Sequence, residues 1–439
     1  MSQEVVSILV LVAIFAIGTL RPINMGLLGI AAAFIVGTAI GTDEDTIFAG
    51  FPGELFIILV GVTYLFAIAN NNGTVDWLVH AAVRGVGGRV AFIPWVMFLV
   101  TSVLTWVGAV VPAAVAIMAP IGLGFAVRYR INPVLMGLLI INGATAGGFS
   151  PISVFGSITN GVVNDANLEG NPTLLWISSY LFNLVLSIVV FFLFGGRELL
   201  TRRVDTDPEA TERFNRERTE TGQPVIGGGA VDVAAESPGL NRERVITLVG
   251  IVTLVGLAVA PGIDWNPAFI AVTIAVVLSL LMPHVTKDAA AKVAWPTVLL
   301  ICGIVMYVEL LREMGTIDWL GETVADVGTP LITALLICFI GAAVSAFAST
   351  TGILAALIPL AVPFLSQGEI GAVGVIIALC IASSVVDSSP FSTSGALTVA
   401  NTPEERRDRV YRRLLQWGMS MIIIAPVTAW AIFVLPGWL

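Results

Sequence analysis

The chain has 439 residues, of which 57% are hydrophobic and 12% are charged, and its formal net charge is −9. Because soluble domains carry about 25% charged residues, this composition excludes an ordinary soluble protein and favours one with many membrane-spanning helices. No basic segment precedes the first apolar block and no cleavage site follows it, so we interpret that block as a retained span. Blocks long enough to cross about 30 Å of hydrocarbon include residues 5–20, 174–194, 245–260, 268–282 and 417–435.

The first half contains two segments that do not fit a simple span. Residues 92–127 are too long for one crossing and too short for two, so we predict a re-entrant hairpin whose tip, around residues 106–112, lies near the membrane midplane. Residues 133–162 form a span that is interrupted by Gly147-Gly148 and by Ser150-Pro151. Since proline fits the first turn of a new helix, this span is predicted to be a broken helix.

A polar stretch at residues 197–244 is rich in Arg, Glu, Thr and Gly and lacks apolar periodicity, which predicts a flexible linker between two hydrophobic halves, 1–196 and 245–439. With this linker in the cytoplasm, nearly all Lys and Arg fall on the same side, and only Arg312 lies outside. The positive-inside rule therefore predicts a cytoplasmic linker and two external termini, in the inner (cytoplasmic) membrane.

The second half repeats the order of the first. Residues 73–78 (GTVDWL) recur at 315–320 (GTIDWL), the matching hairpin occupies residues 331–365, and the matching broken helix occupies residues 371–400. Each half is assigned five spans and a hairpin, and an odd number of spans gives the halves opposite orientations. We therefore predict an all-α polytopic membrane protein of two inverted repeats, each with a re-entrant hairpin and a broken helix, an architecture typical of secondary transporters.

The hairpin tips and helix breaks are the predicted binding site, because irregular backbone in a bilayer is tolerated only where it is buried in protein or lines a wet cavity. Small residues there also suit ordinary helix contacts, but four symmetric breaks favour a site. Half-helix N-termini attract carboxylates, and unwound carbonyls suit a small cation. No Lys, Arg or His lies in the predicted core, which favours an anion held by dipoles and hydroxyls. Asp387, at a break, is interpreted as binding a cation or carrying a proton.

The residues at the two breaks, 142–148 (NGATAGG) and 383–397 (SSVVDSSPFSTSGAL), resemble those of the ion transporter superfamily. Within it, the chain is most similar to the MatC-type malonate/C4-dicarboxylate carriers. The resemblance implies a homodimer and an elevator-type transporter, in which a transport domain moves against a scaffold. The symporter branch has Ser-Asn-Thr at each hairpin tip, whereas this chain has residues 349–351 (STT) and 110–112 (VVP) there. The first tip lacks hydroxyls, so both Na+ and H+ stay open as the coupling ion.

The breaks and the resemblance together single out two overlapping sets of candidate residues. The expected substrate-binding residues are Asn142, Thr145, Ser150, Pro151, Ser153, Ser349, Thr350, Thr351, Ser389, Pro390 and Ser392. The expected cation-coupling residues are Thr105, Gly108, Gly147, Gly148, Ser345, Ser349, Thr350, Asp387 and Ser388.

We predict a secondary carrier that imports a small dicarboxylate with Na+ or H+, with no cofactor and no nucleic-acid partner. The alternative is the same fold with another cargo: citrate or another carboxylate, arsenite, or cations exchanged for protons, although few membrane carboxylates are present for such exchange. An enzyme is disfavoured because HExxH, GxSxG and histidines within spans are absent from the sequence. A primary pump is disfavoured because the sequence has no phosphate-binding loop.

Overall fold

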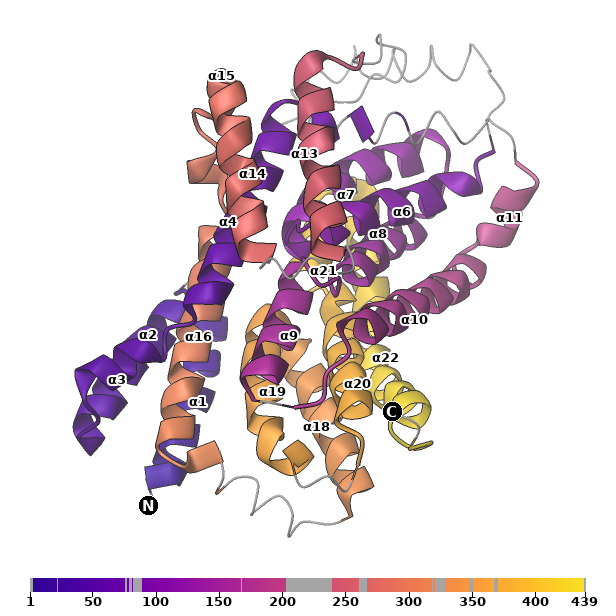
Figure 1. Cartoon of the computed structure of the whole chain (residues 1–439). Coiled ribbons are helices and arrows are strands. Elements are labelled where there is room, and N and C mark those ends of the chain that lie inside the picture. The colour runs from indigo at the N-terminus through magenta and orange to yellow at the C-terminus, as the bar shows by residue number, and fades with distance from the viewer. Residues whose placement is uncertain are drawn as a thin grey trace.

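The structure is a computed structural model, and its described residues form helices joined by short connections (Figure 1). The prediction of an all-helical fold is confirmed for this part of the chain. The described residues are 3–21, 23–75, 77–78, 81, 89–166, 168–202, 239–259, 267–317, 319, 329–346, 350–366 and 370–437.

The ends of the predicted linker, 197–244, belong to two helices, α11 and α13, while residues 203–238 lie outside the described residues. The helices before the linker are α1 (Gln3–Leu20), α2 (Met25–Ile40), α3 (Glu44–Ala49), α4 (Gly53–Asn71), α6 (Phe92–Trp106), α7 (Val111–Arg128), α8 (Pro133–Gly147), α9 (Val154–Asp165), α10 (Pro172–Leu193) and α11 (Gly196–Leu200). Those after it are α13 (Arg242–Val259), α14 (Pro267–Leu281), α15 (Pro283–Thr286), η1 (Ala290–Lys292), α16 (Trp295–Glu313), α18 (Pro330–Ser345), α19 (Thr350–Ser366), α20 (Ala372–Val385), η2 (Val386–Ser388), α21 (Thr393–Ala400) and α22 (Glu404–Phe433).

Asparagine caps fix where several of these helices begin. Asn24 Oδ1 accepts a hydrogen bond from the Gly26 amide at 2.9 Å at the start of α2. Asn132 and Asn171 cap α8 and α10 in the same way, each followed directly by a proline. An asparagine cap satisfies an amide that the helix leaves free, and proline at the first helical position has no amide to satisfy. The sequence therefore sets the start of these helices locally.

The exposed faces of the long helices are apolar, as lipid contact requires. In α10, Leu181 and Val185 are exposed whereas Ser179, Asn183 and Ser187 are fully buried. A helix on the surface of a soluble protein shows the opposite distribution, with polar residues exposed and apolar residues buried. Within the described residues, six stretches are long and apolar enough to cross a membrane: Glu44–Asn71, Val111–Arg128, Pro172–Leu193, Trp295–Glu313, Ala372–Ala400 and Glu404–Phe433. Shorter apolar helices complete the bundle, among them α6, α8, α18 and α19.

Helices of the two halves cross in matching pairs. Helix α2 packs against α16, and α4 packs against α14. Gly303 of α16 lies against the backbone of Gly26, and Gly61 of α4 lies against Val272. Because lipid tails give no hydrophobic drive for helix association, close backbone approach at small residues supplies the packing energy instead. Each glycine of the matched pair Gly61 and Gly303 thus meets a helix of the opposite half.

The repeated Gly-Thr motif ends α4 and α16 in the same geometry. Gly73 and Gly315, each just beyond the helix end, have φ values of +71° and +72°. Such left-handed residues terminate helices, and glycine adopts them without a Cβ clash. The nearly equal angles show that the two copies of the motif end their helices in the same local geometry.

The same motif contacts the first helix of the opposite half. Thr316 Oγ1 lies 3.1 Å from Ser7 Oγ of α1, and Asn72, which binds the Thr74 hydroxyl, donates to Thr247 Oγ1 of α13 at 2.6 Å. These buried bonds join the halves at matching places.

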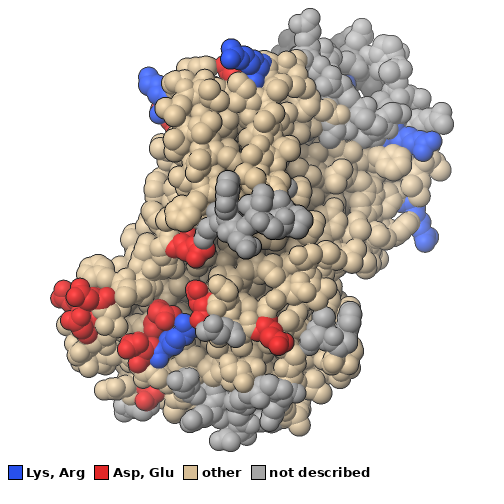
Figure 2. Space-filling view, viewed as in Figure 1, with Lys and Arg blue, Asp and Glu red and all other residues tan. Residues whose placement is uncertain are grey.

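The remaining helices form a second bundle, with α6, α7, α8, α9 and α10 from the first half and α18 to α22 from the second (Figure 1). Helix α9 packs against α19, and α7 packs against α21. Charged side chains gather at opposite ends of the visible face: Lys and Arg lie near α15 and α11, whereas Asp and Glu lie toward the end with α3 (Figure 2).

Candidate functional site

The first interruption in the bundle separates α8 from α9 at residues 148–153. Ser153 caps α9, because its Oγ accepts a hydrogen bond from the Gly156 amide at 3.4 Å. The same hydroxyl donates to the carbonyl oxygens of Ser150, at 2.7 Å, and of Gly148. One buried serine thus satisfies both the new helix and the interrupted chain, so the break is stable inside the protein.

The first break contacts the tip of the first hairpin, residues 107–110 between α6 and α7. Ser150 Oγ donates to the carbonyl oxygen of Trp106 at 2.8 Å. Gly147 fits closely here, since a Cβ on it would lie 2.3 Å from Thr105 Oγ1. The structure therefore brings the first hairpin and the first broken helix together, as a shared site requires.

Gly108 occupies the tip itself, with a φ of +115° that favours glycine. A Cβ on it would lie 1.7 Å from Val62 Cγ1 of α4. Near it, the Thr105 hydroxyl donates to carbonyl oxygens of its own helix. The predicted first cation set (Thr105, Gly108, Gly147 and Gly148) is thus gathered around one tip, but it supplies a single side-chain oxygen.

The second break repeats the construction of the first. Ser392 Oγ accepts from the Gly395 amide at 3.3 Å and donates to the carbonyl oxygens of Ser389, at 2.7 Å, and of Asp387. Ser388 Oγ donates to the Val385 carbonyl oxygen at 3.1 Å. The second break is therefore also capped by its own serine.

Asp387 lies in this second break and is 5% exposed. Its Oδ2 accepts a hydrogen bond from Ser394 Oγ at 2.5 Å, and the Ser394 amide also donates to the carboxylate. Glu243 pairs with His284 and Glu309 pairs with Arg312, whereas Asp387 forms no ion pair within the described part of the chain. Burying a carboxylate in a membrane bundle costs free energy, so a carboxylate at such a position is a candidate for a functional role.

The second hairpin tip carries hydroxyls. Ser345 Oγ and Thr350 Oγ1 lie 2.8 Å apart, and Thr350 and Thr351 are 4% and 5% exposed. Helix α19 begins at Thr350, so Thr350 and Thr351, predicted at the tip, lie in its first turn. Ser349 lies outside the described residues. Helix α18 of this hairpin packs against η2, so tip and break are neighbours here as well.

Two candidates on α8 have side chains engaged away from the tips. Asn142 Nδ2 donates to Ser187 Oγ of α10 at 3.1 Å, and Thr145 Oγ1 donates to the Ile141 carbonyl oxygen at 3.0 Å. The prolines of the two breaks, Pro151 and Pro390, follow the serines that form them.

Sequence reasoning missed two serines at the breaks. Ser394 binds the Asp387 carboxylate, and its place two residues after the capping Ser392 was a usable signal. Ser157 is buried, and its Oγ has no hydrogen-bond partner among the described residues. A serine one helical turn after the capping Ser153 was the corresponding signal in the first half.

Comparisons with known proteins assign both halves to carrier families. The profile of the family described as "Dicarboxylate carrier protein MatC N-terminus" matches residues 1–148, and that of the "Citrate transporter" family matches residues 268–436. The fold is similar to the crystal structure of the YdaH transporter of Alcanivorax borkumensis, with a TM-score of 0.59, 14% identity and 89% of each chain covered. No curated protein matches the chain.

The matches of the two halves to carrier families support a place for the chain in the ion transporter superfamily, with a relation to the MatC carriers. The chain is a multi-pass membrane protein and a secondary transporter of the carboxylate type, not an enzyme. The resemblance predicted from the two breaks is thereby confirmed. The family matches do not assign the site residues, which are inferred from the geometry of the breaks and hairpin tips.

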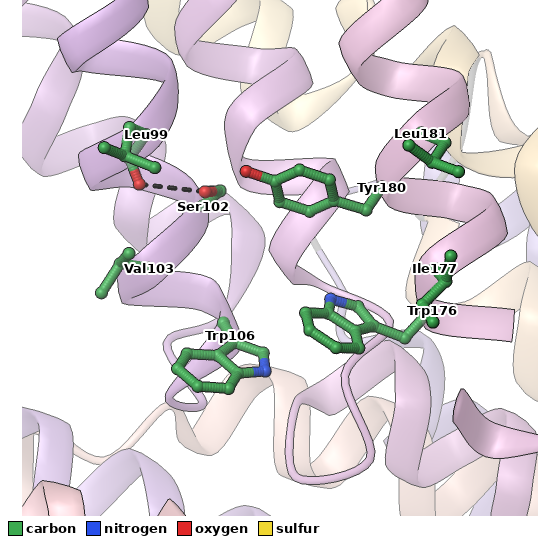
Figure 3. Close-up of a pocket in the computed structure, with 8 residues that line it drawn as sticks. All are labelled: Leu99, Ser102, Val103, Trp106, Trp176, Ile177, Tyr180 and Leu181. Carbon is green, nitrogen blue, oxygen red and sulfur yellow. Dashed lines mark hydrogen bonds between the residues drawn. The ribbon is translucent and has the colours of Figure 1, made fainter. Parts of the chain in front are cut away.

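A pocket of about 350 Å³ in the carrier lies between α6 and α10, and Trp106 in its wall adjoins the first hairpin tip (Figure 3). Its walls are largely apolar, with the Trp106 and Trp176 rings stacked 5.8 Å apart. The Ser102 hydroxyl at its edge donates to the Leu99 carbonyl oxygen. A dicarboxylate would lose its hydration in this pocket and gain little in return, so the pocket is not the substrate site.

The two half-helices of the carrier differ in exposure. Thr393, Ala396 and Ala400 form an exposed face of α21, whereas Val154 and Ser157, at the matching positions of α9, are buried. Helix α9 packs against α4 and α19. Helix α9 is therefore covered by other helices of the described part of the chain, whereas α21 leaves one face uncovered.

The outer end of α9 also lies near charged groups of other helices. Partial burial and the nearby Glu54 of α4 raise the pKa of the Asp165 carboxyl, while Arg312 of α16 lowers it. The charged groups that act on Asp165 thus include one from α4, the helix that packs against α9.

Proposed function

We propose that this carrier imports a small dicarboxylate, of the malonate and C4-dicarboxylate class, together with Na+ or H+. The observation that carries the proposal is the pair of buried helix breaks, each capped by a serine and each beside a hairpin tip. The family match of the first half to a dicarboxylate carrier supports this cargo.

The breaks can hold an anion without a basic side chain. Helix N-termini carry roughly +0.5 of an elementary charge and present free amides. Helices α9 and α19 lie side by side, and α19 begins with two buried hydroxyls, Thr350 and Thr351. Two adjacent N-termini suit a molecule with two carboxylates. A small cation bound with the substrate would offset the remaining charge.

We further propose that residues 1–196 and 245–439 are inverted repeats that work as an elevator. In this proposal α1 to α4 and α13 to α16 form a scaffold, which also forms a homodimer. The transport domain comprises α6 to α10 and α18 to α22. The matched crossings of α2 with α16 and of α4 with α14 support the division. The tip contact of Gly108 with Val62 is then one that transport must break.

The proposed orientation puts residues 203–238 in the cytoplasm and both termini outside, in the inner (cytoplasmic) membrane. The separation of basic and acidic side chains toward opposite ends supports it (Figure 2).

Citrate is the second candidate cargo. The citrate transporter family matches residues 268–436, a range that includes the second tip and the second break. Malonate, succinate and citrate differ in length and in carboxylate count, so binding measurements separate them.

A thermal-shift series on the purified protein tests the proposal. Carboxylates of three to six carbons, with one, two or three carboxyl groups, are each added in sodium and in potassium buffer. A ligand at about one hundred times its Kd stabilises the folded state by about 2.7 kcal/mol, so the carried acid raises the melting temperature. We expect a C3 or C4 dicarboxylate to do so, and a sodium requirement identifies the ion. Stabilisation by citrate alone favours the second cargo, and no shift with any carboxylate contradicts the proposal.

A further inference from the structure

The two helix breaks correspond residue by residue at a constant offset in the sequence. The capping Ser153 corresponds to Ser392, and Ser150 corresponds to Ser389. A Cβ on Gly156 would lie 1.8 Å from the Ser150 carbonyl oxygen, and one on the matching Gly395 would lie 1.9 Å from that of Ser389. Because the backbones agree so closely, the side chains that differ between the breaks show how their functions differ.

The largest difference is one carboxylate. At the position of Gly148 in the first break, the second break has Asp387. The Asp387 carboxylate accepts hydrogen bonds from the hydroxyl and the amide of Ser394, the second residue of α21. The N-terminus of α21 therefore already has an anion of the protein bound to it, whereas the N-terminus of α9 has none from this position.

A second difference favours an anion at the first break. Ser157 follows the capping Ser153 by four residues and so lies on the same face of α9. It is 7% exposed, and its Oγ has no partner among the described residues. The matching residue in α21 is Ala396, which has no hydroxyl. A buried hydroxyl without a partner costs free energy unless a ligand completes its bonding.

The charge of Asp387 is not balanced by a neighbouring side chain. The elements packed against η2 are α8, α18, α20, α21 and α22. Their titratable side chains in the described part of the chain are the thiols of Cys338 and Cys380, and the groups of α22 within residues 404–413, at the exposed start of that helix. The partial positive charge at the start of α21 is about half of the carboxylate charge. An ionised Asp387 thus leaves the second break net negative, which suits a cation.

We propose that the two breaks bind different ligands. A substrate carboxylate binds at the N-terminus of α9, with Ser153 and Ser157, and the coupling cation binds at Asp387. This inference rests on the proposed function, since it says where in the carrier each ligand binds. The first half of the chain then binds the anion and is called the anion half. The second half binds the cation and is called the cation half. The coupling cation is either Na+ bound by the carboxylate or a proton that neutralises it.

Succinate and malonate binding to the purified full-length protein tests this division, in sodium and potassium buffers and across a pH series. For Asp387→Asn we expect the dependence of binding on sodium or pH to be lost: affinity should equal that of the sodium-free wild type if Na+ couples, and that of the wild type at low pH if H+ couples. Loss of a sodium effect identifies Na+, and loss of a pH effect identifies H+. A folded Asp387→Asn protein that keeps the wild-type dependence on both sodium and pH overturns the proposal.

A matched pair of variants at Gly148 tests the anion half. Gly148→Asp puts a carboxylate where the second break has one, and Gly148→Ala controls for volume, since a Cβ there would lie 3.0 Å from Val111 Cγ2. We expect Gly148→Asp to bind at least about tenfold more weakly than Gly148→Ala, a difference of about 1.4 kcal/mol. Equal affinities overturn the proposal.

If the Gly148 variants do not fold, Ser157→Ala provides a second test. This change introduces the alanine that the matching position of α21, Ala396, already has, so we expect it to fold. We expect weaker succinate binding with an unchanged dependence on sodium and pH, and wild-type affinity overturns the proposal. If the wild-type protein binds no carboxylate, the proposed function itself fails. If the wild-type protein binds a carboxylate but the variants do not show the expected changes, only the assignment of ligands to the two breaks fails.

Discussion

Gly303 of α16 and Gly26 of α2 lie in backbone contact where the two halves of the carrier cross. A Cβ on Gly303 would lie 1.9 Å from the carbonyl oxygen of Gly26, and one on Gly26 would lie 1.8 Å from that of Leu299. At such distances even a methyl group must push the helix backbones apart. This crossing therefore depends on the absence of side chains at both residues.

Gly303→Ala is expected to destabilise the carrier, because overpacking costs about 1–3 kcal/mol. Gly256→Ala in α13 is the matched control, since a Cβ there has no atom within 4 Å. In a helix this exchange is favourable by up to about 1 kcal/mol. Thermal unfolding in detergent should show a clear loss for the first variant and none for the second. Equal melting temperatures would contradict the crossing geometry.

The hydroxyl pair at the second tip should act as one unit. Ser345 Oγ and Thr350 Oγ1 are 2.8 Å apart and buried. Ser345→Ala and Thr350→Ala are each expected to weaken succinate or cation binding by about fivefold, roughly 1 kcal/mol. Because either change breaks the same hydrogen bond, the double variant should lose little more than the worse single variant. Multiplicative losses in a titration would show that the two hydroxyls act independently.

The sequence predicted the helical class and the carrier family because both rest on strong local signals. Long apolar blocks specify membrane helices, and the residues of 383–397 carry the family resemblance. The interruptions at Gly148 and Ser389 were visible because Gly, Ser and Pro are breaks in otherwise apolar runs. These features need no knowledge of which helices touch.

The contacts of the site could not be predicted, since they depend on tertiary packing. Ser394 was missed because its partner, Asp387, reaches it only through the geometry of the second break. Asn142 was predicted to bind substrate, but its amide donates to Ser187 on α10, distant in sequence. Gly108 was expected at the tip, yet its contact with Val62 needs the placement of α4. Local patterns thus specify candidates, and the packing of helices decides what each one touches.

The proposed orientation predicts which face of the membrane each connection occupies. The native cysteines are buried, so a thiol reagent should label a newly introduced exposed cysteine in preference to them. Thr201→Cys, just after α11, should react only with reagents that cross the membrane, whereas Asp43→Cys, which caps α3, should react with impermeant reagents in whole cells. Unsubstituted protein is the control for both. The opposite labelling pattern would invert the topology.

The difference in exposure between α9 and α21 predicts one-sided access in the conformation described here. Thr393 at the start of α21 is exposed, while Val154, at the corresponding position of α9, is 3% exposed. In proteoliposomes of known orientation, Thr393→Cys should react with an impermeant thiol reagent applied from the face that carries the central linker. Val154→Cys should react at least about tenfold more slowly from either face, since its thiol is reached only when the other conformation forms.

An inverted-repeat carrier exchanges the environments of its matched helices as it changes conformation. Agents that promote the opposite conformation should therefore slow labelling at Thr393→Cys and speed it at Val154→Cys. The carried dicarboxylate, added with its coupling ion to one face only, supplies this bias in the same experiment. Labelling rates that stay equal at the two positions, with and without substrate, would show that α9 and α21 do not exchange access and would rule out the elevator mechanism proposed for this carrier.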